Sequence, residues 1–163
     1  MLIFTSDHGY FYGEHGLGPE RRLAYEETIR IPLLVRYPRR FRLGSSPSAF
    51  VVSVDIAATA LAAAGVAAPR PFHGRPLWSK SHRDAVLIEY FSDTVFPHIH
   101  KMGYYAVRTD RWKYVHYRER EGTDELYDLR KDPFELDNRI ADNKAPLGRL
   151  RAHLTRLLAE TGA

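Results

Sequence analysis

The sequence predicts an α/β chain in which the tail of a parallel-sheet core is followed by a small α+β subdomain. Three patterns lead to this prediction. Residues 1–5 form a short apolar run, residues 53–65 form an apolar segment of helical length, and residues 104–117 are rich in β-branched and aromatic side chains. Runs of these lengths suit the strands and helices of a folded globule.

The run at residues 1–5 favours a buried strand, because it is apolar and ends at once in a polar loop. In open α/β sheets, ligands collect at the carboxyl ends of strands, and Asp7 and His8 lie at such an end. A carboxylate oxygen and an imidazole nitrogen together suit a divalent cation. The same residues also suit an ordinary turn, so the pair alone leaves both interpretations open.

The segment at residues 53–65 predicts a helix. Ser53 or Asp55 can cap its start, and Gly65 can end it. Its side chains are apolar nearly all round, so we expect this helix to be buried.

The C-terminal half predicts a small antiparallel sheet covered by one helix. Residues 85–91, 104–108, 112–117 and 125–129 favour strands, and a short Thr-Asp-Arg turn between the middle two indicates a hairpin. Pro146 then opens a segment with the 3.6-residue period of an amphipathic helix. Its apolar stripe consists of Leu147, Leu150, Leu154, Leu157 and Leu158.

We place the domain boundary near residues 79–84, so that residues 1–82 belong to the core and residues 83–163 form the subdomain.

No apolar run approaches the ~20 residues that cross a bilayer, and no basic-then-apolar leader opens the sequence. The chain has no cysteine, which excludes disulfides, thiolate metal sites and a cysteine nucleophile within it.

The formal charge of +4 is unevenly distributed. Residues 1–85 hold 11 Lys and Arg against 7 Asp and Glu, whereas each class numbers 13 beyond them. A basic half could attract phosphate, sulfate or nucleic acid. Because no nucleic-acid-binding motif is present, we expect no nucleic-acid partner. An arginine-rich solvated surface is the simpler interpretation of the charge.

A longer pattern spans residues 1–38, and it resembles the sulfatase family of the alkaline-phosphatase superfamily. Its parts, in order, are Thr5-Ser6-Asp7-His8-Gly9, Gly13-Glu14-His15-Gly16-Leu17, a basic pair, Tyr25-Glu26-Glu27 and a second apolar strand that ends at Pro38. Residues 53–65, 74–77, 106–114 and 125–135 also resemble later segments of that family. The resemblance implies the end of an alkaline-phosphatase-like core followed by the sulfatase C-terminal subdomain.

The resemblance implies that Asp7 and His8 complete a divalent metal site whose other ligands this chain does not contain. The usual sulfatase cation is calcium. Many sulfatases have Asn where His8 stands, and histidine there is similar to phosphonate monoester and phosphodiester hydrolases. A nitrogen ligand also favours manganese or zinc, so the metal stays open between Ca2+, Mn2+ and Zn2+.

The resemblance also implies a basic residue that contacts the sulfate group. Arg21 matches this position best, and Arg22 stands next to it. An arginine fork can hold a tetrahedral oxyanion with two hydrogen bonds. The alternative for Arg21 is a salt bridge to Glu20, Glu26 or Glu27. His15 could line the same pocket or could stabilise its own loop.

Sulfatases of this family use a formylglycine made within a Cys/Ser-x-Pro-x-Arg motif, and this chain has no such motif. We therefore expect an incomplete hydrolase with weak metal binding and little or no turnover of its own. Two alternatives remain: a fragment of a phosphonate monoester or phosphodiester hydrolase, and a non-catalytic module that keeps the fold.

The implied partner is a sulfate ester, either a small molecule or a glycan. A strand edge exposed at residues 1–5 would also favour a homo-oligomer. The sequence leaves the specific substrate and the cellular compartment open.

Overall fold

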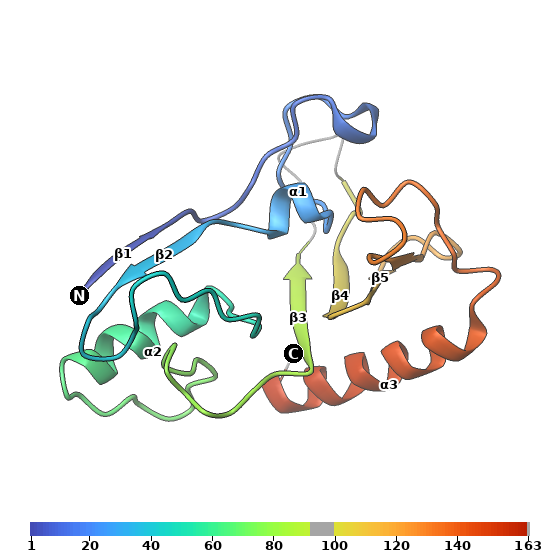
Figure 1. Cartoon of the computed structure of the whole chain (residues 1–163). Coiled ribbons are helices and arrows are strands. Elements are labelled where there is room, and N and C mark those ends of the chain that lie inside the picture. Colours follow the sequence, from blue (N-terminus) through green and yellow to red (C-terminus); the bar gives the residue numbers. More distant parts are fainter. Residues whose placement is uncertain (92–99, 163) are drawn as a thin grey trace. The chain divides into compact units, whose positions relative to one another are not determined.

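The computed structural model describes residues 1–91 and 100–162. The chain forms two compact units (Figure 1). The first consists of Met1–Asp7 and Ile31–Asp84, and the second of His8–Arg30 and Ala85–Ala163. The chain therefore enters the second unit twice, first at His8 and finally at Ala85.

The first unit contains a two-stranded sheet of β1 (Leu2–Thr5) and β2 (Leu33–Arg36). The strands are antiparallel, with Leu2 opposite Arg36 and Thr5 opposite Leu33. The parallel pairing that the sequence predicts for residues 1–5 therefore does not occur among the described residues. The expectation of a buried strand is also wrong among the described residues, since three of the four residues of β1 are exposed. The physical reason is that an apolar run shows a tendency to be covered but specifies neither the strand direction nor the elements that cover it.

One face of this two-stranded sheet is apolar and exposed. Leu2 is 62% exposed, Phe4 58% and Leu34 65%. The register places these three side chains on the same face, because side chains alternate along a strand. Ile3 and Val35 point to the other face and are half-buried.

Helix α2 (Val54–Ala63) follows in the first unit. The Asp55 carboxylate binds the backbone just before the helix, since its Oδ2 accepts the Val52 N–H at 3.0 Å, whereas Ser53 makes no side-chain cap bond. Gly65 ends the helix with a φ of 72°, as predicted. Only one side of α2 is buried, around Asp55, Ala58 and Thr59. The expectation of a helix buried all round was therefore wrong, since small alanines are apolar enough to mislead and are tolerated in solvent.

The second unit contains a four-stranded antiparallel sheet in the order β3-β4-β5-β6. Its strands are β3 (Ala85–Tyr90), β4 (Tyr104–Thr109), β5 (Trp112–Tyr117) and β6 (Glu125–Asp128). Helix α3 (Lys144–Thr161) packs against this sheet. These elements confirm the predicted antiparallel sheet and amphipathic helix.

Each face of this sheet has its own apolar cluster. Val107 and Tyr114 point to the α3 side, where they pack with Leu150 and Leu154. On the other face, a second cluster contains Ala106 and Val115 from β4 and β5. Its remaining buried members are Ala24, Tyr104 and Tyr117.

Because Ala24 belongs to the second cluster, the His8–Arg30 segment covers the face of the sheet that α3 leaves open. We call this segment the motif loop. No helix among the described residues is long and apolar enough to cross a membrane.

Candidate functional site

The two ends of the motif loop lie side by side through backbone hydrogen bonds. The Gly9 N–H donates to the Thr28 carbonyl at 2.7 Å, and the Tyr10 N–H donates to the Glu27 carbonyl at 3.1 Å. A Cβ atom at Gly9 would lie 1.9 Å from the Glu27 carbonyl oxygen, so only glycine allows this approach. The loop is thus closed at its base just after His8.

Buried ionic contacts fasten the motif loop to the four-stranded sheet. The Glu26 carboxylate accepts two hydrogen bonds from Arg108 of β4, both at 3.0 Å. The Glu26 N–H donates to Glu135 at 2.7 Å. Lys113 of β5 is fully buried, pairs with Glu135 and lies 3.7 Å from a Glu26 oxygen. These four residues, Glu26, Arg108, Lys113 and Glu135, form what we call the anchor cluster.

Burial dominates the electrostatics of the anchor cluster. It lowers the pKa of Lys113 and raises the pKa of Glu135, although their mutual attraction opposes both shifts. Burial also acts to raise the pKa of Glu26, but the hydrogen bonds from Arg108 and the charge of Lys113 outweigh it, so that this pKa is lowered. The Glu26 carboxylate therefore remains ionised and bound to Arg108 at neutral pH.

Tyr25 and His15 form the interior of the motif loop. The Tyr25 hydroxyl donates to Glu125 at 3.3 Å, and burial raises the pKa of Tyr25 to about 12. The His15 ring stacks on the Tyr25 ring, with 4.0 Å between centroids, and its Nε2 lies 3.4 Å from a Glu27 carboxylate oxygen. The His15 side chain is only 11% exposed. This placement gives His15 a loop-stabilising role, and its contact with substrate stays a prediction.

The two candidate arginines differ in their surroundings. Glu20 is buried, and its Oε1 accepts the N–H groups of Arg21 and Arg22 at 2.6 and 2.9 Å. The same oxygen binds the Arg22 guanidinium at 3.0 Å. The Arg21 side chain is exposed and pairs with no carboxylate in the described parts of the chain. The Arg22 guanidinium is therefore bound to Glu20, whereas the Arg21 guanidinium is exposed.

Three carboxylates could have paired with Arg21 as a purely structural alternative. Each of them has another cationic or imidazole partner: Glu20 binds Arg22, Glu26 binds Arg108, and Glu27 lies beside His15. None of the three pairs with Arg21.

Asp7 ends the first stretch of the first unit, and His8 opens the second unit. The Ser6 hydroxyl donates to Asp7 at 3.3 Å, and His8 Nδ1 lies 2.7 Å from the Gly9 carbonyl oxygen. Within residues 1–91 and 100–162, no group of three or more His, Cys, Asp or Glu gathers as a metal site. Two donors fall short of a usual protein ligand set, so these residues alone do not form a complete site.

No sequence motif marks the four residues of the anchor cluster as a group. A lysine in the middle of an apolar strand, as Lys113 is between Trp112 and Tyr114, was the available signal. Its partner Glu135 could not be deduced, because only the fold brings the two residues together.

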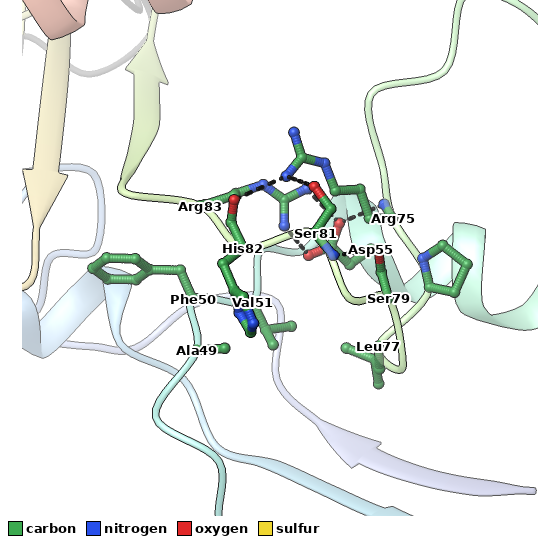
Figure 2. Close-up of a pocket in the computed structure, with 11 residues that line it drawn as sticks. Ala49, Phe50, Val51, Asp55, Arg75, Leu77, Ser79, Ser81, His82 and Arg83 are labelled. Carbon is green, nitrogen blue, oxygen red and sulfur yellow. Dashed lines mark hydrogen bonds and ion pairs between the residues drawn. The ribbon is translucent and has the colours of Figure 1, made fainter. Parts of the chain in front are cut away.

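A second buried ionic group lies in the first unit, beside a small cavity (Figure 2). Arg83 donates to both oxygens of Asp55 at 2.7 Å, and the Arg75 N–H donates to Asp55 Oδ1 at 2.7 Å. The cavity measures about 30 Å³, which is room for little more than one water molecule. This group joins the start of α2 to the chain that follows it, and it leaves no space for a substrate.

Comparison with known proteins places the motif loop and the four-stranded sheet within a single family match. The profile of the family described as "N-sulphoglucosamine sulphohydrolase, C-terminal" matches residues 13–162. The chain belongs to this sulfatase family. The match begins inside the motif loop and ends at residue 162, just after α3, so it includes residues 31–84 of the first unit as well as most of the second unit.

Sulfatase relatives extend the similarity over the whole chain. An N-acetylglucosamine-6-O-sulfatase of Bacteroides thetaiotaomicron is 34% identical over 99% of this chain and 30% of its own length. A protein solved in complex with its substrate D-glucosamine-2-N,6-O-disulfate is 33% identical, with a TM-score of 0.82, over 98% of this chain and 33% of that one. The chain thus spans about a third of the length of these relatives.

The same fold also occurs in a phosphonate monoester hydrolase. That enzyme, from Agrobacterium radiobacter, is 28% identical and has a TM-score of 0.79, over 96% of this chain and 34% of that one. The neighbours confirm the predicted α/β fold of the sulfatase type.

Proposed function

We propose that this chain is the C-terminal part of a hydrolase that cleaves sulfate esters of sugars. The observation that carries the proposal is the sulfatase family match over residues 13–162. The relatives named for N-acetylglucosamine 6-O-sulfate and solved with a disulfated glucosamine support a sulfated amino sugar as the substrate class. In the reaction, water cleaves the ester and releases the sugar hydroxyl and inorganic sulfate. The nucleophile belongs to a part of the hydrolase outside this chain.

In this proposal Arg21 contacts the sulfate group of the substrate. Its guanidinium is exposed and pairs with none of the nearby carboxylates, so its charge is available to an oxyanion. Arg22 instead holds the loop through Glu20, and His15 supports the same loop from inside. The anchor cluster keeps this segment on the sheet, which orders the arginine before substrate binds.

We further propose that Asp7 and His8 supply two ligands of a divalent cation, with the remaining ligands outside this chain. The 2.7 Å contact of His8 Nδ1 with the Gly9 carbonyl supports Nε2 as the ligating nitrogen, because a carbonyl oxygen only accepts and therefore favours a proton on Nδ1. Calcium fits the family, and manganese or zinc fits the imidazole donor. The cation, when bound, would neutralise charge on an ester oxygen.

A phosphonate or phosphodiester hydrolase is the second candidate. His8 favours it, and so does the 28% identity to a phosphonate monoester hydrolase. Sulfate and phosphonate esters both present a tetrahedral oxyanion that an exposed arginine can bind. Arg21 of the motif loop therefore suits either substrate.

The test is a side-by-side turnover assay of the complete hydrolase that the proposal implies, with a 6-O-sulfated glucosamine and a phosphonate monoester. We expect a higher kcat/KM for the sulfate ester. Arg21→Gln should lower kcat/KM by about tenfold or more, because it removes a charged hydrogen bond to the substrate. Arg22→Gln is the matched change beside it, and it should act mainly on stability. A preference for the phosphonate would replace the proposal with the second candidate.

A further inference from the structure

Positive charge is concentrated in the first unit. Met1–Asp7 and Ile31–Asp84 contain eight Lys and Arg but three Asp and Glu. The second unit has sixteen of the basic class and seventeen of the acidic class. The net positive charge of the chain therefore comes from the smaller of the two units.

Half of these basic residues lie at the end of β2 and in the short turn that follows it. The segment Arg36-Tyr37-Pro38-Arg39-Arg40-Phe41-Arg42 contains four arginines, and we call it the arginine turn. Within it the N–H groups of Arg40 and Phe41 both donate to the Tyr37 carbonyl, at 2.9 and 3.0 Å. These bonds close residues 37–41 into a single turn, with Arg39 and Arg40 inside it and Arg36 and Arg42 on either side of it.

An aromatic anchor holds the arginine turn in place. Tyr37 and Phe41 both lie against Trp78, with 5.6 and 6.4 Å between ring centroids. The Arg40 guanidinium stands 5.2 Å from the centre of the same indole. The three rings are half-buried by these contacts. The turn is therefore an ordered structure and not a loose basic tail.

The arginines of this turn have no carboxylate partners among the described residues. Arg36, Arg39 and Arg42 are exposed and form no ion pair there. Asp55 of the same unit is buried and binds Arg83 instead. Exposed arginines of the second unit differ, because Arg130, Arg139 and Arg156 each pair with a carboxylate.

We propose that the arginine turn binds a sulfated saccharide chain, as a surface additional to the sulfate-contacting residues of the motif loop. The choice of a sulfated saccharide rests on the proposed function, whereas the affinity for a polyanion rests on the charge of the turn. Guanidinium forks pair with sulfate oxygens through two hydrogen bonds, and several forks on one ordered turn can engage successive sulfate groups.

The aromatic rings favour a saccharide over a nucleic acid. Single-stranded nucleic acids gain much of their affinity from bases stacked on exposed rings. Tyr37, Phe41 and Trp78 are packed on one another and on Arg40, so they serve the turn itself. What the turn offers a ligand is charge and hydrogen bonds.

The experiment measures binding of the 163-residue chain to a highly sulfated glucosamine-containing octasaccharide by calorimetry across a salt series. The variant is Arg36→Gln, Arg39→Gln and Arg42→Gln together, which leaves Arg40 on Trp78. The matched control removes three exposed charges from the second unit: Arg130→Gln, Arg139→Gln and Arg149→Gln. A third variant, with lysine at positions 36, 39 and 42, keeps the charge without the forks. Circular dichroism checks that all are folded.

We expect the glutamine variant of the turn to bind roughly tenfold or more weaker and to lose about two units of the salt slope, since each of the three neutralised contacts contributes roughly 0.7 for a single-stranded polyanion. The control should lose less than about threefold. The lysine variant should bind with intermediate affinity, because it keeps charge but not the bidentate geometry.

Equal losses in the turn variant and the control would overturn the proposal, because net charge alone would then explain binding. Equal or tighter binding of a single-stranded DNA of matched charge would overturn the saccharide assignment. The assay involves no turnover, so its failure is distinct from a failure of sulfate release, which would count against the proposed function.

Discussion

Lys113 offers the sharpest test of how the motif loop is held. Its side chain is 0% exposed, and so is that of its partner Glu135. Lys113→Met replaces the lysine with an apolar chain of similar length and leaves the Glu135 carboxylate buried without its counter-charge. Glu26 keeps its two hydrogen bonds from Arg108. The change therefore isolates one buried charge on Glu135.

The expected loss follows from this arrangement. Removing one partner of a buried ion pair destabilises by about 3–5 kcal/mol. A domain of ordinary stability has about 5–15 kcal/mol in all, so the loss is a large share. Adding Glu135→Gln should restore most of it, because the neutral amide oxygen can still accept the Glu26 N–H that now lies 2.7 Å away. We expect the double variant to fall within about 2 kcal/mol of the original protein.

The assay is urea unfolding followed by far-ultraviolet circular dichroism, with hydrogen exchange of the β4 and β5 amides to report on the second unit. Lys131→Met, at an exposed lysine, is the matched control and should change the free energy of unfolding by less than about 0.5 kcal/mol. A loss for Lys113→Met no larger than that of the control would refute the reasoning. A double variant that shows the sum of both single losses would refute it as well.

Three further predictions concern other parts of the chain. Gly9→Ala should destabilise the second unit by roughly 1–3 kcal/mol through the clash with Glu27, whereas Gly18→Ala, whose Cβ meets nothing within 4 Å, should be nearly neutral in urea unfolding. The hydrogen bond from Arg111 lowers the pKa of Asp128 below its ordinary 3.8, so this pair should stabilise above about pH 4. The difference in Tm between the protein and Arg111→Gln should then shrink as the pH falls below that value, and a constant difference would contradict it. The exposed apolar face of β1 and β2 should give dimers or larger species in size-exclusion chromatography, and a stable monomer would rule this out.

The local elements could be predicted from the sequence because their signals are local. Alternation and aromatic content located β4 and β5, the leucine period located α3, and Gly65 ended α2. The direction of β1 against β2 has no such signal, because it depends on where the chain returns. The partly exposed surface of α2 was missed for a related reason, since alanine suits both buried and exposed positions.

The residues of the candidate site could be predicted from the sequence, but most of their contacts could not. Family-like motifs identified Asp7, His8, His15, Arg21 and Arg22 as the residues to consider. Only the fold shows that Glu20 takes Arg22 and that His15 stacks inside the loop. The anchor cluster joins residues more than 80 positions apart, such as Glu26 and Arg108 with a separation of 82. Sequence periodicity carries no information over that distance.

The most direct test of the central claim is the gene sequence immediately upstream of the Met1 codon, read in the same frame. We expect an open frame that encodes further acidic metal ligands and a Cys/Ser-x-Pro-x-Arg motif, which would complete a sulfate-ester hydrolase. An in-frame stop codon followed by a genuine start signal at Met1 would contradict this expectation, because no upstream segment would then supply the nucleophile.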